Sequence, residues 1–592
     1  MLHKISLVIA ILNFALCPSI AIAAEQHIVT VERGVEATMR DGTVLRADIY
    51  RPKEGGRFPV LLQRTPYNKS GEAGFGYKAA ASGYVVIVQD VRGRYTSEGE
   101  WYPFKHESRD GYDTVEWAAA LPYSNGKVGM FGGSYVGATQ MLTAIAHPPH
   151  LAGICPVVTA SNYHNGWTYQ GGAFEQWFNE SWTSGLAQDT LNRAVAKDTN
   201  AMKGIWKLPL TAYPLFNSPN GALKVDSPDE FAPYFLDWLA HPNYDEYWKR
   251  WSIEDHYGQI TVPVLTIAAW YDIFQGGSLR NYEGIKTKGG SEAARRGQHL
   301  LVIIGGHAGS GRKIGEVDFG PAAAEFDGDD ATLQWYDYLF KGVQNQFARK
   351  PVRIFVMGLN QWRDEDSWPL ERARETKYFL HSSTGANSVL GDGSLSTTAP
   401  GAEHSDHYVY DPENPVPTTG GPLCCDSLHL PAGPRDQRPA EARQDVLVYS
   451  TGPFNRDFEV TGPVSLELYA KSSAVDTDFT AKLVDVWPNG FAQNLTEGIV
   501  RARYRNSQET PEMMNPGQIY KFSIDLWSTS NVFRKGHRLR LEIGSSNFPR
   551  FDRNPNTGES PESGSRFVSA TNTIYHDAEH GSVLEIPVVA EH

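Results

Sequence analysis

Hydrophobic positions follow one pattern in the first part of the chain and another in the last third. Up to about residue 349, short and nearly all apolar runs flanked by Gly or Pro alternate with helical stretches. Strands buried on both faces of a parallel sheet have this composition. The runs are residues 59–63, 84–89, 128–131, 151–158, 262–269 and 299–304. They predict an α/β domain in which helices cover both faces of a parallel sheet.

Two local signals add detail at the start of this domain. Residues 28–50 alternate between apolar and polar and contain Asp41-Gly42, which predicts a β-hairpin. Further on, Asp110 precedes a helical pattern over residues 111–121. Aspartate is a favoured N-cap residue, so we expect Asp110 to cap this helix.

The alternation of strands and helices stops over residues 161–259. Aromatic residues are dense in this segment, for example in Trp167-Thr-Tyr169, and no buried-strand run occurs. We expect a helical insertion between two strands of the sheet, placed as a cap over an active site.

Beyond residue 350, strands with a period of two dominate, and turn residues separate them at short intervals. These strands are residues 352–357, 462–469, 479–486, 517–524 and 539–543. The pattern predicts a separate antiparallel β-sandwich. We therefore expect a targeting segment at residues 1–23 and an α/β domain in two parts, at residues 24–160 and 260–349. The insertion occupies residues 161–259, and the sandwich occupies residues 350–592.

The first residues have the composition of a secretory signal. Lys4 supplies a positive end, residues 5–16 form an apolar run, and Ala21-Ile22-Ala23 is a small-residue cleavage site. Because the run is too short to span a bilayer, we expect cleavage rather than anchoring. The mature protein should begin near Ala24 and be exported, to the periplasm or the medium.

Composition narrows the class of protein. A chain of 592 residues with 41% hydrophobic residues is too long for one core and too apolar to be disordered. The formal net charge of −14 argues against nucleic acid or an anionic membrane as partner. These numbers leave open whether the protein is a homo-oligomer.

Three cysteines remain after removal of the targeting segment. Cys155 lies in an apolar stretch and should be buried, whereas Cys424 and Cys425 have no obvious partner elsewhere in the chain. Their disulfide state stays open. No Cys or His spacing typical of a metal site occurs, so we expect no metal ligands.

The strongest chemical signal is the segment Gly132-Gly133-Ser134-Tyr135-Val136-Gly137, between the apolar run 128–131 and a helix rich in small residues. A nucleophile elbow needs such neighbours, because the serine backbone is strained and the turn must close between strand and helix. The usual pattern is G-x-S-x-G, whereas here the second glycine comes one residue later. The alternative interpretation is an ordinary glycine turn.

Two further residues complete a catalytic set. Asp272 follows the predicted strand 262–269, and His307 follows the strand 299–304. The carboxyl ends of parallel strands lie at one edge of a sheet, where Ser134 must also emerge. The order nucleophile, acid, histidine is that of α/β-hydrolases. We therefore expect Ser134, Asp272 and His307 to form a catalytic triad.

Several segments together resemble the family of bacterial cocaine esterases, glutaryl acylases and Xaa-Pro dipeptidyl-peptidases. The resemblance lies in Leu62-Gln-Arg-Thr-Pro-Tyr67, Asp90-Val-Arg-Gly-Arg-Tyr-Thr-Ser-Glu-Gly99, Gly132-Gly-Ser-Tyr-Val-Gly137, Trp270-Tyr-Asp-Ile-Phe274, Gly315-Glu-Val-Asp-Phe-Gly320 and Arg534-Lys-Gly-His-Arg-Leu-Arg-Leu-Glu-Ile543. It covers essentially the whole mature chain. It implies an α/β-hydrolase domain, a helical cap and a C-terminal jelly-roll domain.

The resemblance also implies an oxyanion hole, made by the Tyr67 hydroxyl and the backbone N–H of Tyr135. One feature departs from the family, whose histidine usually lies in a G-P-W-x-H stretch, whereas Gly305-Gly306 precede His307 here. His299 begins the same strand, at the wrong end of the sheet. In the implied mechanism an acyl-enzyme forms on the serine and water releases it, without metal, nucleotide or organic cofactor.

The substrate is less well defined. Family members that act on α-amino esters resemble one another in having acidic residues just after the catalytic aspartate, where this chain has Ile273 and Phe274. An apolar wall there favours a neutral acyl group, so we expect a small ester or amide as substrate. Phe274, Trp167 and Tyr169 are candidate pocket residues, each equally suited to core packing.

Two other functions stay open. One is an Xaa-Pro dipeptidyl-peptidase. The other is a catalytically silent protein whose C-terminal domain binds carbohydrate or a partner surface.

Overall fold

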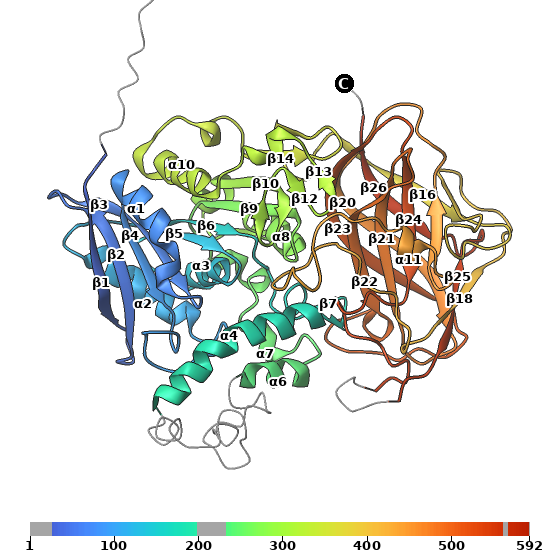
Figure 1. The fold of residues 1–592 in the computed structure, drawn as a ribbon, viewed down its shortest axis with the longest axis horizontal. Coiled ribbons are helices and arrows are strands. Elements are labelled where there is room, and N and C mark those ends of the chain that lie inside the picture. Colours follow the sequence, from blue (N-terminus) through green and yellow to red (C-terminus); the bar gives the residue numbers. More distant parts are fainter. Residues whose placement is uncertain (1–25, 198–231, 560–565, 591–592) are drawn as a thin grey trace, which may run out of the picture.

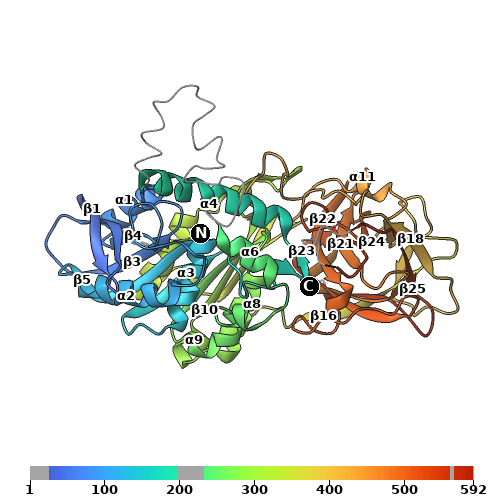
Figure 2. The ribbon, with the colours of Figure 1, turned by 90° about the horizontal axis from the view of Figure 1, so that it is seen from below.

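The computed structural model describes residues 26–197, 232–559 and 566–590. The predicted signal at residues 1–23 lies outside this part of the chain. An α/β domain lies beside a C-terminal β domain, and helices of the insertion run along one side of the α/β domain towards the β domain (Figures 1 and 2). Among the described residues, no helix has both the length and the apolar character needed to cross a bilayer.

The first sheet has the strand order β1-β2-β4-β3-β5-β6-β9-β10-β14-β15, with β11 paired to β10. Neighbours from β4 to β14 are parallel, whereas β1, β2 and β15 pair antiparallel at the two edges. The strands are β1 (Val29–Thr38), β2 (Val44–Pro52), β3 (Phe58–Thr65), β4 (Val85–Asp90), β5 (Ser124–Gly133), β6 (Leu151–Val157), β9 (Val264–Tyr271), β10 (Gln298–Gly306), β11 (Gly309–Ser310), β14 (Val352–Val356) and β15 (Gln361–Glu365). All six predicted buried strands and the predicted hairpin are confirmed.

Both faces of this sheet are covered, as the continuous apolar runs require. Along β4, Val85 and Ile87 pack into one core with α2 (Glu107–Ala120) and α3 (Tyr135–Ile145). Val86 and Val88 pack into a second core with α1 (Ala73–Ala81) and α10 (Gly328–Lys341). Successive side chains of a strand point to opposite faces, so a strand between two helical layers must be apolar throughout.

Helix α2 begins earlier than the sequence suggested. Its first residue is Glu107, and His106 occupies the N-cap position. The Asp110 carboxylate instead accepts hydrogen bonds from the Arg92 guanidinium, at 2.8 and 2.6 Å. The predicted capping role of Asp110 is therefore wrong, because a long-range ion pair uses this side chain.

The chain leaves the sheet after β6 and returns at β9. The described part of this insertion contains a two-stranded hairpin and several helices. They are β7 (Tyr169–Gln170), β8 (Ala173–Phe174), α4 (Gln176–Lys197), α6 (Pro233–Ala240), α7 (Glu246–Lys249) and the 3-10 helix η4 (Glu254–Gln259). In Figure 1, α4 extends from beneath the α/β domain to the C-terminal strands.

The C-terminal domain contains a sheet with the order β18-β25-β20-β26-β16-β17-β19-β24-β21-β22, in which β23 also pairs with β20. The strands are β16 (Ala373–His381), β17 (Ser394–Ser396), β18 (Asp406–Tyr410), β19 (Leu447–Ser450), β20 (Phe458–Ser472), β21 (Asp478–Val486), β22 (Ala492–Arg501), β23 (Tyr520–Phe533), β24 (Arg538–Gly544), β25 (Ala570–Tyr575) and β26 (Val583–Val589). Its core continues across the domain junction to Trp270 and to Leu279 on α8 (Gln275–Lys288).

One predicted strand belongs to the other domain. Residues 352–357 were expected in the sandwich, but β14 pairs parallel with β10 and antiparallel with β15 at the edge of the first sheet. The boundary predicted at residue 350 is wrong for this strand. β14 joins the first sheet because it pairs with backbone groups at the edge of β10 that would otherwise lack partners. Leu300, for example, pairs with Val352.

Candidate active site

Ser134 occupies the tight turn between β5 and α3. Its backbone is in the left-handed region, with φ 61° and ψ −129°. A side chain at Gly132 could not fit, because its Cβ would lie 2.4 Å from Val136 Cγ1. At Gly137 a Cβ would lie 2.8 Å from Thr159 Cβ. The second glycine is thus needed where α3 passes Thr159, which gives a physical reason for the altered spacing of the motif.

Asp272 and His307 follow the neighbouring strands β9 and β10. The Asp272 side chain is fully buried, and its Oδ2 accepts a hydrogen bond from the Phe274 N–H at 2.9 Å. At the end of β10 the register with β9 shifts between Ile303 and Gly306, so that Gly306 pairs with Tyr271. His307 follows directly after this irregularity.

The three residues form one hydrogen-bonded chain. Nδ1 of His307 lies 2.6 Å from Oδ1 of Asp272. Its Nε2 lies 2.8 Å from Oγ of Ser134. Because a carboxylate only accepts, Nδ1 carries the proton donated to Asp272, and Nε2 is free to accept the Ser134 proton. A serine held in this way can be activated as a nucleophile.

The Tyr67 hydroxyl lies beside the nucleophile. It accepts a hydrogen bond from Trp182 Nε1 of α4 at 3.0 Å. Although 39% of the Tyr67 surface is accessible, protein atoms surround the hydroxyl, and this burial raises the pKa of Tyr67. Hydrogen bonds with Trp182, Ser134 and the Tyr135 N–H oppose that rise in pKa. The phenol therefore stays protonated near neutral pH and can donate.

Tyr135 has only its backbone N–H to offer at the serine turn, because its side-chain hydroxyl is hydrogen-bonded elsewhere. Its buried hydroxyl accepts from the Phe104 N–H at 2.7 Å and donates to Glu107 Oε1 at 3.0 Å. Glu107 is in turn paired with Arg64 at 2.7 Å. This network fixes the first turn of α3, whose N–H groups point towards the serine turn.

Of the three predicted pocket residues, Phe274 packs against His307 and Trp167 stacks on Phe274. Phe274 and Trp167 are fully buried, and their rings stack with centroids 4.4 Å apart and an interplanar angle of 9°. The rings of Phe274 and His307 pack edge to face, with their centroids 5.2 Å apart and an interplanar angle of 82°. Tyr169 is placed elsewhere: its hydroxyl donates to the Trp238 carbonyl at 2.9 Å, and the residue lines a different cavity of about 250 Å³.

A cavity of about 500 Å³ opens against His307. Ile314 and neighbouring residues of the β12–β13 hairpin (Lys313–Ile314 and Val317–Asp318) line one side, and a loop of the C-terminal domain lines the other. That loop contributes Leu423, Cys424 and Cys425 to the wall. The two cysteines form a disulfide with each other. The two cysteines therefore need no partner elsewhere in the chain, which resolves the disulfide state that the sequence left open.

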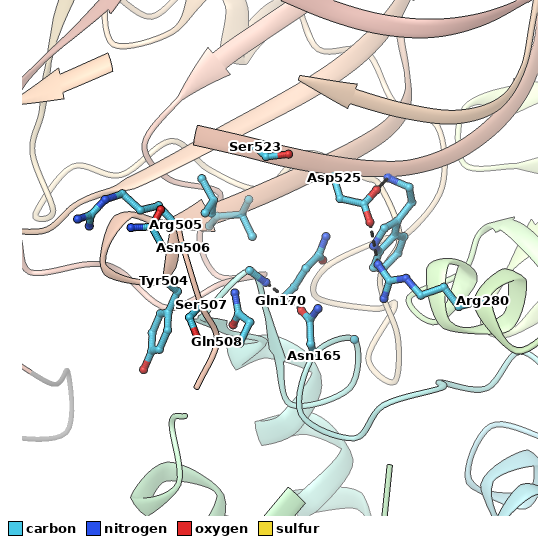
Figure 3. Close-up of a pocket in the computed structure, with 15 residues that line it drawn as sticks. Asn165, Gln170, Arg280, Tyr504, Arg505, Asn506, Ser507, Gln508, Ser523 and Asp525 are labelled. Carbon is cyan, nitrogen blue, oxygen red and sulfur yellow. Dashed lines mark hydrogen bonds and ion pairs between the residues drawn. The ribbon is translucent and has the colours of Figure 1, made fainter. Parts of the chain in front are cut away.

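A second cavity, of about 290 Å³, lies at the junction of the insertion, α8 and the C-terminal domain (Figure 3). Arg280 of α8 reaches Asp525 of β23 across it, at 2.7 Å. Its lining is mainly amide and hydroxyl side chains and includes neither Ser134 nor His307. In the part of the chain that the structure describes, no cluster of three His, Cys, Asp or Glu side chains could hold a metal ion.

The sequence did not single out two features of the site, the contact of Trp182 with the Tyr67 hydroxyl and the bond between the two cysteines in the cavity wall. Trp182 is one of many aromatic residues in the insertion, and nothing in the local sequence distinguishes it. The adjacency of Cys424 and Cys425 was a usable signal, because neighbouring cysteines can be bonded to each other.

Comparisons with known proteins cover both domains of the chain. Residues 41–309 match the family model of X-Pro dipeptidyl-peptidase (S15 family), and residues 345–585 match that of the X-Pro dipeptidyl-peptidase C-terminal non-catalytic domain. Cocaine esterase of Rhodococcus sp. (strain MB1 Bresler) is 37% identical over 580 residues, covering 95% of this chain and 99% of that protein.

Two solved structures share the architecture over nearly the whole chain. An aminopeptidase of a marine sediment Thaumarchaeota archaeon has a TM-score of 0.76 at 25% identity, covering 98% of this chain and 99% of its own. An α-amino acid ester hydrolase has a TM-score of 0.75 at 24% identity, covering 97% of this chain and 100% of its own. The latter likeness establishes the fold, an α/β-hydrolase with a C-terminal β domain.

Proposed function

Since the chain belongs to the family of hydrolases that includes cocaine esterase and the X-Pro dipeptidyl-peptidases, we propose that it cleaves carboxylic esters or amides with Ser134, His307 and Asp272 as catalytic triad. The protein is a hydrolase of the serine-esterase and peptidase type. The observation that carries the proposal is the hydrogen-bonded chain from Ser134 Oγ through the imidazole to Asp272, with distances of 2.8 and 2.6 Å.

The reaction follows from this geometry in two halves. His307 Nε2 accepts the proton as Ser134 Oγ attacks the carbonyl carbon, and Asp272 stabilises the imidazolium that forms. The oxygen of the tetrahedral intermediate is bound by the Tyr67 hydroxyl and the Tyr135 N–H. The imidazolium then protonates the leaving group, and an acyl-enzyme remains. Water, deprotonated by the same imidazole, releases the acid and restores Ser134.

The lining of the cavity favours an ester or acylamide over a peptide with a free amino terminus. An ammonium group in a largely desolvated pocket needs an anionic partner. The lining residues include Lys313 and Arg435 but no aspartate or glutamate in the described part of the chain. Behind His307, the buried Phe274 ring packs against the imidazole and adds no charge to the site. We therefore propose esterase or acylase activity, with Xaa-Pro dipeptidyl-peptidase activity as the competing candidate.

Three further features belong to the same proposal. The helices between β6 and β9 act as a cap, because Trp182 of α4 donates to the Tyr67 hydroxyl. The C-terminal strands form a jelly-roll domain. The chain is exported: its first 23 residues have the composition of a signal, and a Cys424–Cys425 disulfide is compatible with an oxidising compartment.

The test is covalent labelling with a fluorophosphonate probe, followed by a substrate screen. Labelling of the wild-type chain and not of Ser134→Ala is expected. Hydrolysis of p-nitrophenyl esters or β-lactam amides, with much slower cleavage of Xaa-Pro anilides, would support the esterase or acylase proposal. The opposite preference would make it a dipeptidyl-peptidase. Absence of labelling would favour a silent binding protein.

A further inference from the structure

The Cys424–Cys425 disulfide lies in the wall of the cavity that contains His307. The sequence separation of the two cysteines is 1, so their bond cannot hold distant parts of the fold together. A disulfide usually stabilises a protein by closing a long loop, and that effect is minimal for adjacent residues. Its position in the cavity wall therefore points to a local role.

The two cysteines have different surroundings. Cys424 is 6% exposed and belongs to the apolar cluster that also contains Trp167 and Phe274. Cys425 is exposed to solvent, and its φ of 79° lies in the left-handed region that residues other than glycine rarely adopt. The disulfide thus joins the buried aromatic cluster beside His307 to a strained backbone position at the cavity surface.

The loop that contains this pair is fixed at its neck. Gly421 and Gly433 exchange two backbone hydrogen bonds, at 2.8 and 2.9 Å. Just beyond the neck, the Pro434 carbonyl accepts from the Glu316 N–H of the first domain at 2.9 Å. Residues 422–432, between these anchors, form the wall segment. A change within the wall segment can alter the cavity while the neck holds the domains together.

We propose that the Cys424–Cys425 disulfide is a specificity-determining element of the substrate cavity, an inference that rests on the proposed function. Reduction of this disulfide weakens substrate binding without slowing the chemical step. The intact disulfide presents two sulfur atoms as one apolar surface and holds Cys425 in its left-handed conformation. After reduction the two side chains rotate independently, and Cys425 can leave that conformation. The wall next to His307 then loses its shape, whereas Ser134, His307 and Asp272 are untouched.

The chemistry is thiol–disulfide exchange with a dithiol reductant. A thiolate of the reductant attacks the accessible Cys425 sulfur, and Cys424 leaves as a thiolate that takes up a proton. The second thiol of the reductant attacks the mixed disulfide and releases Cys425. Two electrons and two protons pass to the protein, and the reductant becomes a cyclic disulfide. Reoxidation by a disulfide compound of the same class reverses the change.

The experiment compares steady-state kinetics with a p-nitrophenyl ester before and after treatment with dithiothreitol. Mass spectrometry of the peptide that holds both cysteines should show a gain of two hydrogen atoms. We expect KM to rise about tenfold while kcat changes little, since even one lost methylene-sized contact in an apolar pocket can have that effect. Reoxidation should restore the original KM.

Two variants provide the controls. The double variant Cys424→Ala/Cys425→Ala should have the raised KM without treatment and should not respond to dithiothreitol. Cys155→Ala removes the buried free cysteine of the first domain and should respond like the wild type. Circular dichroism and fluorophosphonate labelling should show that both variants are folded and keep a reactive Ser134.

The outcomes separate this inference from the proposed function. An active enzyme whose KM is the same with the disulfide intact, reduced or removed would overturn the inference alone. A fall in kcat with unchanged KM would overturn it too, because the disulfide would then act on the chemical step. A wild-type protein that neither reacts with the probe nor hydrolyses any ester or amide would overturn both.

Discussion

Nε2 of His307 lies 2.8 Å from Oγ of Ser134, although the two residues are 173 positions apart in the chain. Their proximity follows from the order of strands. β5 and β9 both flank β6, and β10 follows β9, so the three turns that carry Ser134, Asp272 and His307 project from the same edge of a parallel sheet. Each strand places one reactive group, and the buried sheet holds the groups in position.

Replacing the serine tests the nucleophile. Ser134→Ala should lower kcat by about 10⁴ or more and leave the melting temperature nearly unchanged, because one hydroxyl is removed from a turn that the glycines still permit. Steady-state hydrolysis and thermal unfolding measure the two effects. Ser523→Ala, in the polar cavity of Figure 3, is the matched control and should keep full activity. Near wild-type turnover by Ser134→Ala would show that another residue is the nucleophile.

The Tyr67 hydroxyl is expected to act mainly in the transition state. Tyr67→Phe should lower kcat by about 10² to 10³ with little change in KM, because the oxyanion forms only after attack on the carbonyl. Tyr410→Phe removes a buried hydroxyl from β18, where it donates to the Asn554 carbonyl at 3.2 Å, and should not affect kcat. If Tyr67→Phe instead raised KM alone, the residue would line the pocket without stabilising the oxyanion.

His164 should make the folded protein sensitive to acid. The side chain is fully buried and stacks on Tyr169, and burial lowers the pKa of His164 to about 4 from its ordinary 6.5. The unfolded chain therefore binds a proton that the folded chain does not. The free energy of unfolding is therefore unaffected by this group above pH 6.5, and it decreases as the pH falls towards 4. Between pH 7.5 and 5 the loss amounts to about 2 kcal/mol.

His164→Gln tests this contribution. Its amide can replace the imidazole as donor to the Pro242 carbonyl, which accepts from Nε2 at 2.8 Å, but it does not titrate. Denaturant unfolding at the two pH values gives the comparison. The variant should lose less unfolding free energy on acidification than the wild type. Equal losses in both proteins would mean that His164 is not responsible.

Much of the first domain could be predicted from the sequence because its strands are buried on both faces. Val85 to Val88 alternate between two cores, so each position must be apolar, and such runs are easily distinguished from amphipathic helices. The order Ser134, Asp272, His307 then located the candidate site, since each residue follows a strand of that kind. The roles of these residues remain predictions until the variants are measured.

The rest depended on contacts between distant segments. Residues 352–357 have the same period as sandwich strands, and only the free edge of β10 decides which sheet they join. Similarly, Trp167 and Tyr169 come from one aromatic-rich stretch, yet Trp167 stacks on Phe274 whereas Tyr169 stacks on His164. Composition cannot distinguish two such neighbours, because both belong to one apolar cluster and only the folded backbone decides that Trp167 meets Phe274 after β9 while Tyr169 meets His164 of the insertion.

The histidine deserves the sharpest test, because its sequence context differs from that of its relatives. Gly305 and Gly306 precede His307 at the irregular end of β10, and the imidazole lies between Ser134 and Asp272. If Nε2 is the general base, activity should fall at acid pH, where a protonated imidazole cannot accept the serine proton. His307→Gln should abolish nearly all turnover. The fall in activity at acid pH, the acid limb of the pH–rate profile, should disappear with it.

His299→Gln provides the matched control. His299 lies at the opposite end of β10, is buried, and hydrogen-bonds through Nε2 to the Phe347 carbonyl at 2.9 Å. Its replacement should cost stability but leave the shape of the pH–rate profile unchanged, because it is far along the strand from the serine. The measurement is kcat/KM across the acid range for the wild type and both variants. If His307→Gln kept the acid limb and substantial turnover, a different general base would have to activate Ser134.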